Sequence, residues 1–387
     1  MRIGQFSDAV LPIVDGVSRV VVSYAQTLAE MGHDSYVVAA SDGMKEHRQY
    51  AFQYIGYQAI PLFCARQYKA GVPMFDRAYH RQVDQIPFDI LHVHAPFMAG
   101  REALRLKKKL GVPLVGSFHS KYYDDFYKMF RSRTIARIGA RWVADFYKKC
   151  DLVFAVSQNS AEVLRSYGYD REVLVIPNGT DLRPMQHRLA CEIRGQFPGK
   201  KLLLFVGQLN WKKNILRTLE VAAELKHLGE PIQLILAGQG PDHQAIVHKA
   251  DELGLHGSIT FTGHISDRDL LDGYYEAADL FLFPSIYDNA PMVVREAAAM
   301  GTPSLLIEGS SAAEHIENDG NGFLCPDETE AITRKTADVL HNPALLKSVG
   351  ESARKTIPIP WEQVVSILLK HYEALMEANR ARREGRN

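Results

Sequence analysis

Short apolar runs alternate with amphipathic stretches along the first half of the chain. The runs predicted as strands are Met1–Phe6, Tyr36–Ala40, Ile90–His94, Pro113–Ser117, Leu152–Val156 and Val173–Ile176. The predicted helices are Val17–Met31, which Gly32 terminates, a segment around Gly100–Leu110, and Ala161–Tyr167. Because strands alternate with helices, we expect a parallel sheet with helices on both faces.

The same pattern starts again in the second half. Strands are predicted at Lys201–Val206, Ile232–Leu236, Ile259–Phe261, Leu280–Pro284 and Ser304–Ile307, and the first helix of this half at Ile215–Leu228. A turn-rich segment at Pro177–Pro184 separates the halves. We therefore expect an α/β protein with one domain over residues 1–183, a second over 184–360, and a last helix at about 361–387 that crosses back to the first domain. Ligands of open α/β sheets bind at the carboxyl ends of the strands, so two facing sheets would form a cleft between the domains.

Composition and charge limit the classes of protein to which this chain can belong. The 387 residues, 46% hydrophobic and 23% charged, are typical of a folded protein of two domains. Lys+Arg and Asp+Glu both total 45, so no global charge favours nucleic acid. We expect a cytoplasmic protein with neither signal peptide nor membrane span, in which Cys64, Cys150, Cys191 and Cys325 are reduced. Residues 101–149 nevertheless carry thirteen Lys/Arg and four Asp/Glu, which suits an anionic partner.

The stretch from Phe283 to Ala299 holds the strongest candidate chemistry. An apolar strand ends at Pro284 and a helix begins near Pro291, with Asp288 in the loop between them and Glu296 on the first helical turns. Amide groups at a helix start attract phosphate, and a carboxylate can bind sugar or ribose hydroxyls. The residues alone leave a second interpretation open, in which Asp288 or Asn289 only caps the helix.

This stretch resembles the E-x7-E motif of the retaining glycosyltransferases of family 4, which have the GT-B fold. Seven residues separate Asp288 from Glu296, and the flanking sequences FPS and EAAAMGTPSLL are also similar. Further similar segments follow in the family's order along nearly the whole chain: PIVDGVSR at 12–19, LHVH at 91–94, GSFHS at 116–120, IPNGTD at 176–181, FVGQL at 205–209 and NGFL at 321–324.

The resemblance implies a role for each matching residue. Gly16 would let the backbone approach the donor diphosphate, and Lys213 would pair with it. Asp288 would bind hydroxyls of the donor sugar, Glu296 the ribose, and His119 would lie near the reactive face of the sugar. His264 or Ile265 would border the nucleobase. Implied as catalytic are His119, Lys213 and Asp288. Implied as donor-binding are Gly16, Gln208, Lys213, His264, Ile265, Asp288, Asn289, Ala290, Pro291, Met292, Val293 and Glu296, of which Ala290–Val293 act through their amides.

Two positions depart from the family pattern. The family usually has Arg where this chain has Gln208, and a neutral amide does not replace a charge-assisted bond to diphosphate. Lys212 is a candidate substitute for that charge. The first acid of the motif is Asp288 rather than Glu, which shortens its reach by one methylene group. Both changes fall in one site and predict an altered donor, slower turnover or lost activity.

Other motifs have simpler explanations. Asp267-Arg268-Asp269 has the form of a DxD metal motif, but its place at a predicted helix start favours capping. His92 and His94 share one face of a strand, and we see no third ligand for a metal. We therefore expect neither a metal nor another cofactor, and a nucleotide sugar as co-substrate.

The segment 128–149 bears on the acceptor side. Ile135, Ile138, Trp142, Val143 and Phe146 fall on one helical face, which we interpret as core, and Arg133, Arg137, Arg141 and Lys148 form a second stripe. The stripe predicts peripheral contact with an anionic membrane, at its inner face. PIVDGVSR and the HSKYY at 119–123 also resemble the diacylglycerol glucosyltransferase branch of the family.

The sequence thus predicts a metal-independent hexosyltransferase of GT-B fold that moves a hexosyl group from a UDP- or GDP-sugar to a hydroxyl with retention. The resemblance implies a front-face route without a covalent nucleophile, in which the leaving phosphate helps to deprotonate the acceptor. Two alternatives remain at this point: a related GT-B epimerase or phosphorylase, and a catalytically weak sugar-nucleotide-binding protein. The acceptor, whether lipid, glycan or small molecule, is open.

Overall fold

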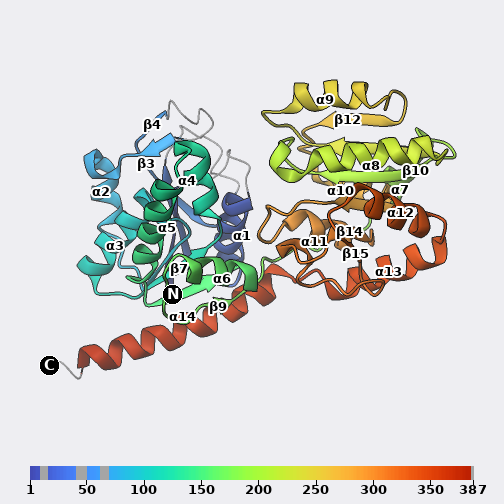
Figure 1. Cartoon of the computed structure of the whole chain (residues 1–387). Helices are drawn as coiled ribbons and strands as arrows, with labels where there is room; N and C mark the ends of the chain where they lie inside the picture. The colour runs from blue at the N-terminus through green and yellow to red at the C-terminus, as the bar shows by residue number, and fades with distance from the viewer. Residues whose placement is uncertain (9–15, 41–49, 62–68, 385–387) are drawn as a thin grey trace. The chain divides into compact units, whose positions relative to one another are not determined.

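The computed structural model describes residues 1–8, 16–40, 50–61 and 69–384. It divides the chain into two compact units (Figure 1). Unit 1 comprises Met1–Gly179 and Trp361–Asn387, and unit 2 comprises Thr180–Pro360. The first boundary therefore falls four residues before the one predicted at 183. Cys64 and the predicted loop Pro12–Asp15 lie outside the described residues.

Unit 1 is built on a parallel sheet in which, among the described residues, seven strands follow the order β3-β2-β1-β6-β7-β8-β9. These strands are β1 (Arg2–Ser7), β2 (Asp34–Ala40), β3 (Gln53–Tyr57), β6 (Ile90–Val93), β7 (Leu114–Phe118), β8 (Leu152–Ala155) and β9 (Leu174–Val175). Its helices are α1 (Gly16–Glu30), α2 (Arg77–Val83), α3 (Met98–Leu110), α4 (Tyr122–Phe130), α5 (Arg133–Tyr147), α6 (Gln158–Ser166) and α14 (Trp361–Glu384). A short antiparallel pair, β4 (Ala59–Pro61) and β5 (Lys69–Gly71), completes it.

Helix α14 belongs to unit 1 although it ends the chain, and Figure 1 shows it running along that unit near β9. Trp361 is buried, and its ring lies edge-on to Tyr24 of α1 at 5.7 Å. A Cβ atom on Gly179 would come within 2.4 Å of the Trp361 ring, so the end of unit 1 and the start of α14 are closely packed. Trp361 therefore packs α14 against the rest of unit 1.

Unit 2 has a parallel sheet of six described strands in the order β12-β11-β10-β13-β14-β15. They are β10 (Lys201–Val206), β11 (Ile232–Ala237), β12 (Ile259–Gly263), β13 (Leu280–Phe283), β14 (Ser304–Ile307) and β15 (Phe323–Cys325). The helices are α7 (His187–Gly195), α8 (Ile215–His227), α9 (His243–Glu252), α10 (Arg268–Ala277), α11 (Met292–Ala299), α12 (Thr329–Leu340) and α13 (Pro343–Thr356), with short 3-10 turns at Trp211–Lys213 and Ser311–Ala313.

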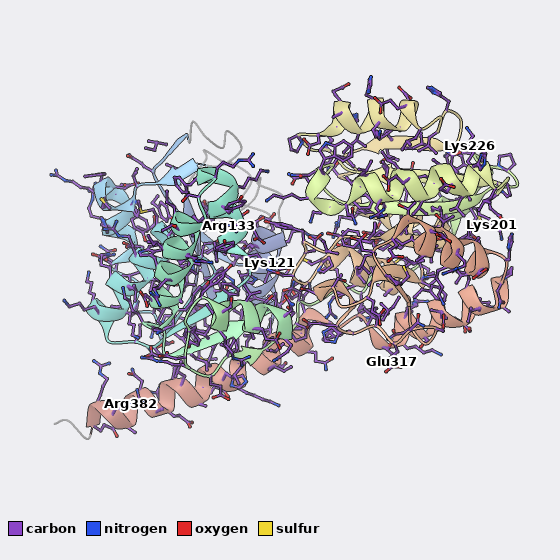
Figure 2. The ribbon with its side chains drawn as sticks, in the orientation of Figure 1. Lys121, Arg133, Lys201, Lys226, Glu317 and Arg382 are labelled. Carbon is purple, nitrogen blue, oxygen red and sulfur yellow. The ribbon has the colours of Figure 1, made fainter. Side chains whose placement is uncertain are left out.

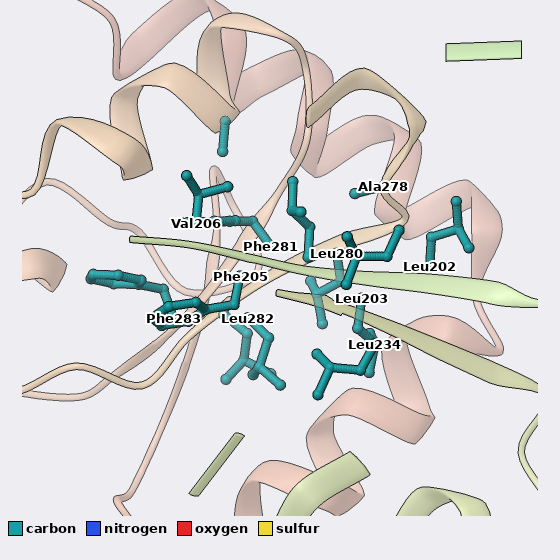
Figure 3. Close-up of a cluster of buried hydrophobic side chains, with 14 of the residues drawn as sticks. Leu202, Leu203, Phe205, Val206, Leu234, Ala278, Leu280, Phe281, Leu282 and Phe283 are labelled. Carbon is teal, nitrogen blue, oxygen red and sulfur yellow. The ribbon is translucent and has the colours of Figure 1, made fainter. Parts of the chain in front are cut away.

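The core of unit 2 forms around its two central strands, whose residues are almost all apolar. Phe205, Phe281 and Phe283 are fully buried, and Figure 3 shows them within the apolar cluster. The ring of Phe283 stacks on those of Phe205 and Phe281 at centroid distances of 5.6 Å. Strands that are apolar on both faces need helices on both sides of the sheet, which fixes the α/β layering. This rigid centre carries the loops in which the candidate chemistry lies.

The structure corrects the prediction for residues 128–149. The segment contains the end of α4, at Arg131 with a positive φ of 51°, and the whole of α5, which starts where the Ser132 hydroxyl accepts from the Ile135 amide. Val143 and Phe146 are buried as expected, but Ile135, Ile138 and Trp142 are 45%, 65% and 45% exposed. The assignment of all five to one core face was therefore wrong. The inward face of α5 consists of Ala136, Ala140, Val143, Ala144, Phe146 and Tyr147.

Candidate active site

Three strand ends of unit 2 come together through glycines. The amide of Gly207 donates to the Ala237 carbonyl at 3.0 Å, and that of Gly238 donates to the Gly263 carbonyl at 2.8 Å. Gly238 has a φ of +145°, and a Cβ atom there would lie 1.9 Å from the Gly207 oxygen. No other residue fits this approach. The loops that start with Gln208, Gln239 and His264 therefore lie together at one edge of the sheet.

Lys213 and Asp288 form an ion pair at the carboxyl ends of β10 and β13. Lys213 ends a 3-10 turn that the Asn210 side chain caps by accepting from the Lys212 amide. The next residue, Asn214, has a φ of +56° and donates to the Pro284 carbonyl at 3.1 Å, which ties this turn to the end of β13. The second oxygen of Asp288 accepts from the Ser285 hydroxyl at 2.6 Å.

Helix α11 begins after Pro291, its N-cap residue, which makes no side-chain capping hydrogen bond. The carboxylate of Asp288 is engaged with Lys213 and Ser285, so the interpretation of Asp288 as a simple helix cap is wrong. Amide groups at a helix start attract an anion.

Glu296 is buried on α11, and both of its oxygens have partners. Tyr275 donates its hydroxyl to one oxygen at 3.0 Å, and Arg268 donates to the other at 3.2 Å. Arg268 and Tyr275 both lie on α10. Burying a carboxylate is costly unless it is hydrogen-bonded and paired, and here both conditions are met. The carboxylate is thus held in one orientation.

Arg268 and Tyr275 were missed as site residues from the sequence. Arg268 lies inside the DxD-like triplet, of which only the capping role was predicted. That role is present, since Asp267 accepts from the amides of Asp269 and Leu270. Between these two acids, the Arg268 side chain reaches Glu296 on the neighbouring helix.

The remaining predicted donor residues of unit 2 lie around this centre. Gln208 and His264 are exposed, and Ile265 is half-buried. Lys212 places its ammonium group 4.4 Å from the centre of the Tyr287 ring and 3.1 Å from the Tyr287 oxygen, next to Asp288. Asn289, Ala290, Pro291 and Val293 are half-buried, and Met292 is buried.

Gly16 and His119 belong to unit 1. Gly16 is the first residue of α1, and a Cβ atom on it would meet nothing within 4 Å. His119 directly follows β7 and is 9% exposed, and burial lowers its pKa to about 4. His119 is therefore a neutral ring at ordinary pH.

His92 and His94 do not form a metal site. The ring nitrogens of His92 contact Tyr372 and Ser117, and those of His94 contact Gln5 and His119. Within the part of the chain that the structure describes, no group of three His, Cys, Asp or Glu side chains could hold a metal ion. Cys150 and Cys325 are buried free thiols and Cys191 is an exposed one.

Taken by itself, unit 2 offers cationic side chains, a helix start and an oriented buried carboxylate at the carboxyl edge of a parallel sheet. This set can hold a diphosphate and fix hydroxyl groups. With a second Rossmann-like unit before it, the chain has the make-up of a GT-B glycosyltransferase that uses nucleotide sugars.

Comparison with known proteins identifies the family. Residues 14–183 match the model described as Glycosyltransferase Family 4, and residues 192–356 match that of Glycosyl transferases group 1. The chain belongs to glycosyltransferase family 4 and is a retaining enzyme that uses nucleotide sugars. This confirms the predicted family, fold and class of reaction.

Three similar proteins illustrate the range of the family. The alpha-monoglucosyldiacylglycerol synthase of Streptococcus pneumoniae is 27% identical over 82% of this chain and 74% of its own. A GDP-mannose-dependent alpha-mannosyltransferase of Corynebacterium glutamicum is 23% identical over 96% and 88%. The crystal structure of Anabaena HepE in complex with UDP has a TM-score of 0.78 at 17% identity, covering 97% of this chain and all of that one.

Proposed function

We propose that this enzyme binds a UDP- or GDP-hexose through unit 2 and transfers the hexose to the hydroxyl group of a lipid. The observation that carries the donor part is the arrangement around α11. Glu296 would bind the ribose, Asp288 the sugar hydroxyls, and the amides of residues 290–293 the sugar and phosphate oxygens. Lys213 would pair with the diphosphate, and the loop that holds His264 and Ile265 would border the base.

We infer that Lys212 takes over part of the charge that Gln208 lacks. Its ammonium group lies beside Tyr287, one residue before Asp288, so that two lysines meet at the same loop. Two cations and a helix N-terminus can stabilise the leaving diphosphate, which makes a metal unnecessary. Gly16 and His119 of unit 1 would act on the diphosphate and on the donor sugar respectively.

The acceptor part rests on the surface of α4 and α5 in unit 1. Arg133, Arg137 and Arg141 are exposed there, and Figure 2 labels Arg133 on this surface. Beside them lie exposed apolar side chains: Met129, Phe130, Ile135, Ile138 and Trp142. Cationic and apolar side chains exposed side by side fit the interface of an anionic membrane.

A pocket next to this surface could receive the head group of the acceptor. It has a volume of about 680 Å³ and includes Lys121, Tyr123, Arg137, Arg141 and Tyr167 in its lining. Lys121 is two residues beyond His119, so the pocket lies near the end of β7.

Among the helices that the structure describes, none combines the length and the apolar character needed to span a bilayer.

The donor assignment is tested with Glu296→Gln. Titration calorimetry should show that UDP and UDP-glucose, or GDP and GDP-mannose, bind at least about tenfold more weakly to the variant, because a bond to a charged group contributes about 1.5–3 kcal/mol. Glu102→Gln is the matched control, since Glu102 is also buried and paired with an arginine, Arg105, but lies on α3 of unit 1. Equal donor affinity in Glu296→Gln and the wild type would refute the assignment.

The membrane assignment is tested by sedimentation with vesicles of phosphatidylglycerol and phosphatidylcholine. Replacing Arg133, Arg137 and Arg141 together by Gln should weaken binding by roughly 3 kcal/mol, at about 1 kcal/mol per charge near the surface. The control replaces three exposed cations of unit 2, Arg334, Arg354 and Lys355. If both triple variants bind like the wild type, α5 is not the membrane-binding surface.

A further inference from the structure

A cluster of buried polar side chains lies behind His119 in unit 1. It joins the ends of three strands and the C-terminal helix, and consists of Gln5, His92, His94, Ser117, His119 and Tyr372. All six are less than a tenth exposed. Three histidine rings buried together at the end of a parallel sheet need an explanation, because buried polar groups are retained at a cost in stability.

The direction of the hydrogen bonds follows from Gln5. In the structure its side-chain oxygen, which can only accept, lies 2.8 Å from Nε2 of His94, and this orientation of the amide places the proton of His94 on Nε2. Burial lowers the pKa of His94 well below its usual value, so the ring is neutral and its Nδ1 is an acceptor. That Nδ1 lies 3.0 Å from Nε2 of His119, which must therefore donate. His119 is fixed as the Nε2–H tautomer, with the lone pair on Nδ1.

A second layer holds His94 in place. The ring of His92 stacks on that of His94 at a centroid distance of 4.4 Å. Nδ1 of His92 is 2.5 Å from the Tyr372 hydroxyl, and its Nε2 is 2.7 Å from the Ser117 hydroxyl. Tyr372 lies on α14, 280 residues along the chain from His92. The last helix thus completes a network whose first member is in β1.

We propose that His94 is a positioning residue that fixes the tautomer and the ring plane of His119 toward the donor sugar, and that Tyr372 supports it through His92. This inference rests on the proposed role of His119. His94 itself is buried and would act only through His119. A partner that orients a histidine in this way acts on the chemical step, because it sets which ring nitrogen carries the proton and which way the ring faces.

The tautomer can be measured directly. In 15N-histidine-labelled protein, two-dimensional NMR distinguishes a protonated from an unprotonated ring nitrogen, and the spectrum of His119→Gln assigns the His119 signals. We expect protonated Nε2 and unprotonated Nδ1 at pH 7.5. Finding the proton on Nδ1 would overturn the proposal without the need for any further variant.

Kinetics test the consequence. His94→Leu should lower kcat by roughly 10- to 100-fold, the usual effect of removing the partner that orients a functional histidine, with little change in the KM of the donor. His94→Asn should restore most of kcat, since its side-chain oxygen can take the place of Nδ1. Tyr372→Phe should lower kcat less than His94→Leu does. Its matched control is Tyr57→Phe, which removes another buried hydroxyl of unit 1 that donates to the Ser7 carbonyl.

The outcomes separate this inference from the proposed function. If His119→Gln loses activity while His94→Leu keeps the wild-type kcat, the positioning role is wrong and the function of His119 stands. If His119→Gln keeps full activity, the role of His119 in the proposed function fails and the inference fails with it. Thermal unfolding of each variant shows whether a lost activity comes from a lost fold, and if His94→Leu does not fold, the NMR result and Tyr372→Phe decide.

Discussion

Acidification should destabilise unit 1 through its buried histidines. Burial lowers the pKa of His92 to about 3 and that of His119 to about 4, from a usual value of 6.5. Below pH 6.5 the unfolded chain takes up protons at these rings and the folded chain does not, so stability present above pH 6.5 is lost as the pH falls toward the folded pKa. Each of these two rings therefore lowers the free energy of unfolding by about 2 kcal/mol at pH 5 relative to pH 7.5.

Other groups modify the total. Burial also lowers the pKa of His94, which acts in the same direction. Burial raises the pKa of Asp8 from 3.8 to about 6, so the folded state takes up this proton first and gains about 1 kcal/mol at pH 5. The net loss is about 3 kcal/mol or more. This is a large part of the 5–15 kcal/mol that stabilises a typical domain.

Tryptophan fluorescence during urea unfolding measures this loss. Of the three tryptophans, Trp142 and Trp361 lie in unit 1 and Trp211 in unit 2. In a Trp211→Phe background the signal reports on unit 1, and its free energy of unfolding should be about 3 kcal/mol smaller at pH 5 than at pH 7.5. His119→Asn should reduce this difference by about 2 kcal/mol. The reasoning is refuted if the wild-type stability is equal at both pH values.

Two further changes test unit 2. Gly238→Ala should destabilise it by roughly 3 kcal/mol, because the new methyl group would meet the Gly207 carbonyl and the backbone is strained. The control is Gly254→Ala: Gly254 also has a positive φ, but a methyl group there would meet no other atom, so only backbone strain should lower the free energy of unfolding. Unfolding of unit 2 is followed by the fluorescence of Trp211. If both variants lose the same free energy of unfolding, the clash with Gly207 is excluded. Gln208→Arg should raise kcat roughly tenfold through a charge-assisted bond to the diphosphate, worth about 1.4 kcal/mol. An unchanged kcat, as expected for the surface control Gln196→Arg, would show that the β10 loop does not contact the phosphates.

Local patterns in the sequence predicted the parallel α/β architecture and most strands of both sheets, because each of those strands is an apolar run. Strands β3 and β15 were not predicted: β3 contains Gln53 and Gly56, and β15 has only three residues. The residues alone marked a strand-to-helix turn with two acids. The resemblance to family 4, and not spacing by itself, singled out Asp288, Glu296 and Lys213 as candidates for the donor site.

Contacts between distant segments could not be predicted. Tyr275 and Arg268 reach Glu296 from another helix, and no pattern in the sequence shows that either side chain contacts this carboxylate. Ile138 and Trp142 were assigned to the core because periodicity shows that apolar residues share a face but not what covers it. His94 was considered as a metal ligand. Its partner is instead His119, which lies beside it because β6 and β7 are neighbouring strands.

The return of the C-terminal helix has a consequence for synthesis on the ribosome. Residues 180–360 form a continuous unit and can fold as soon as they emerge, but unit 1 lacks α14 until the last residues are made. Until then, Tyr24 has no Trp361 to pack against and His92 has no Tyr372. The nascent first unit thus waits with an uncovered apolar surface while nearly half of the chain is translated, a period in which chaperones or early aggregation would act.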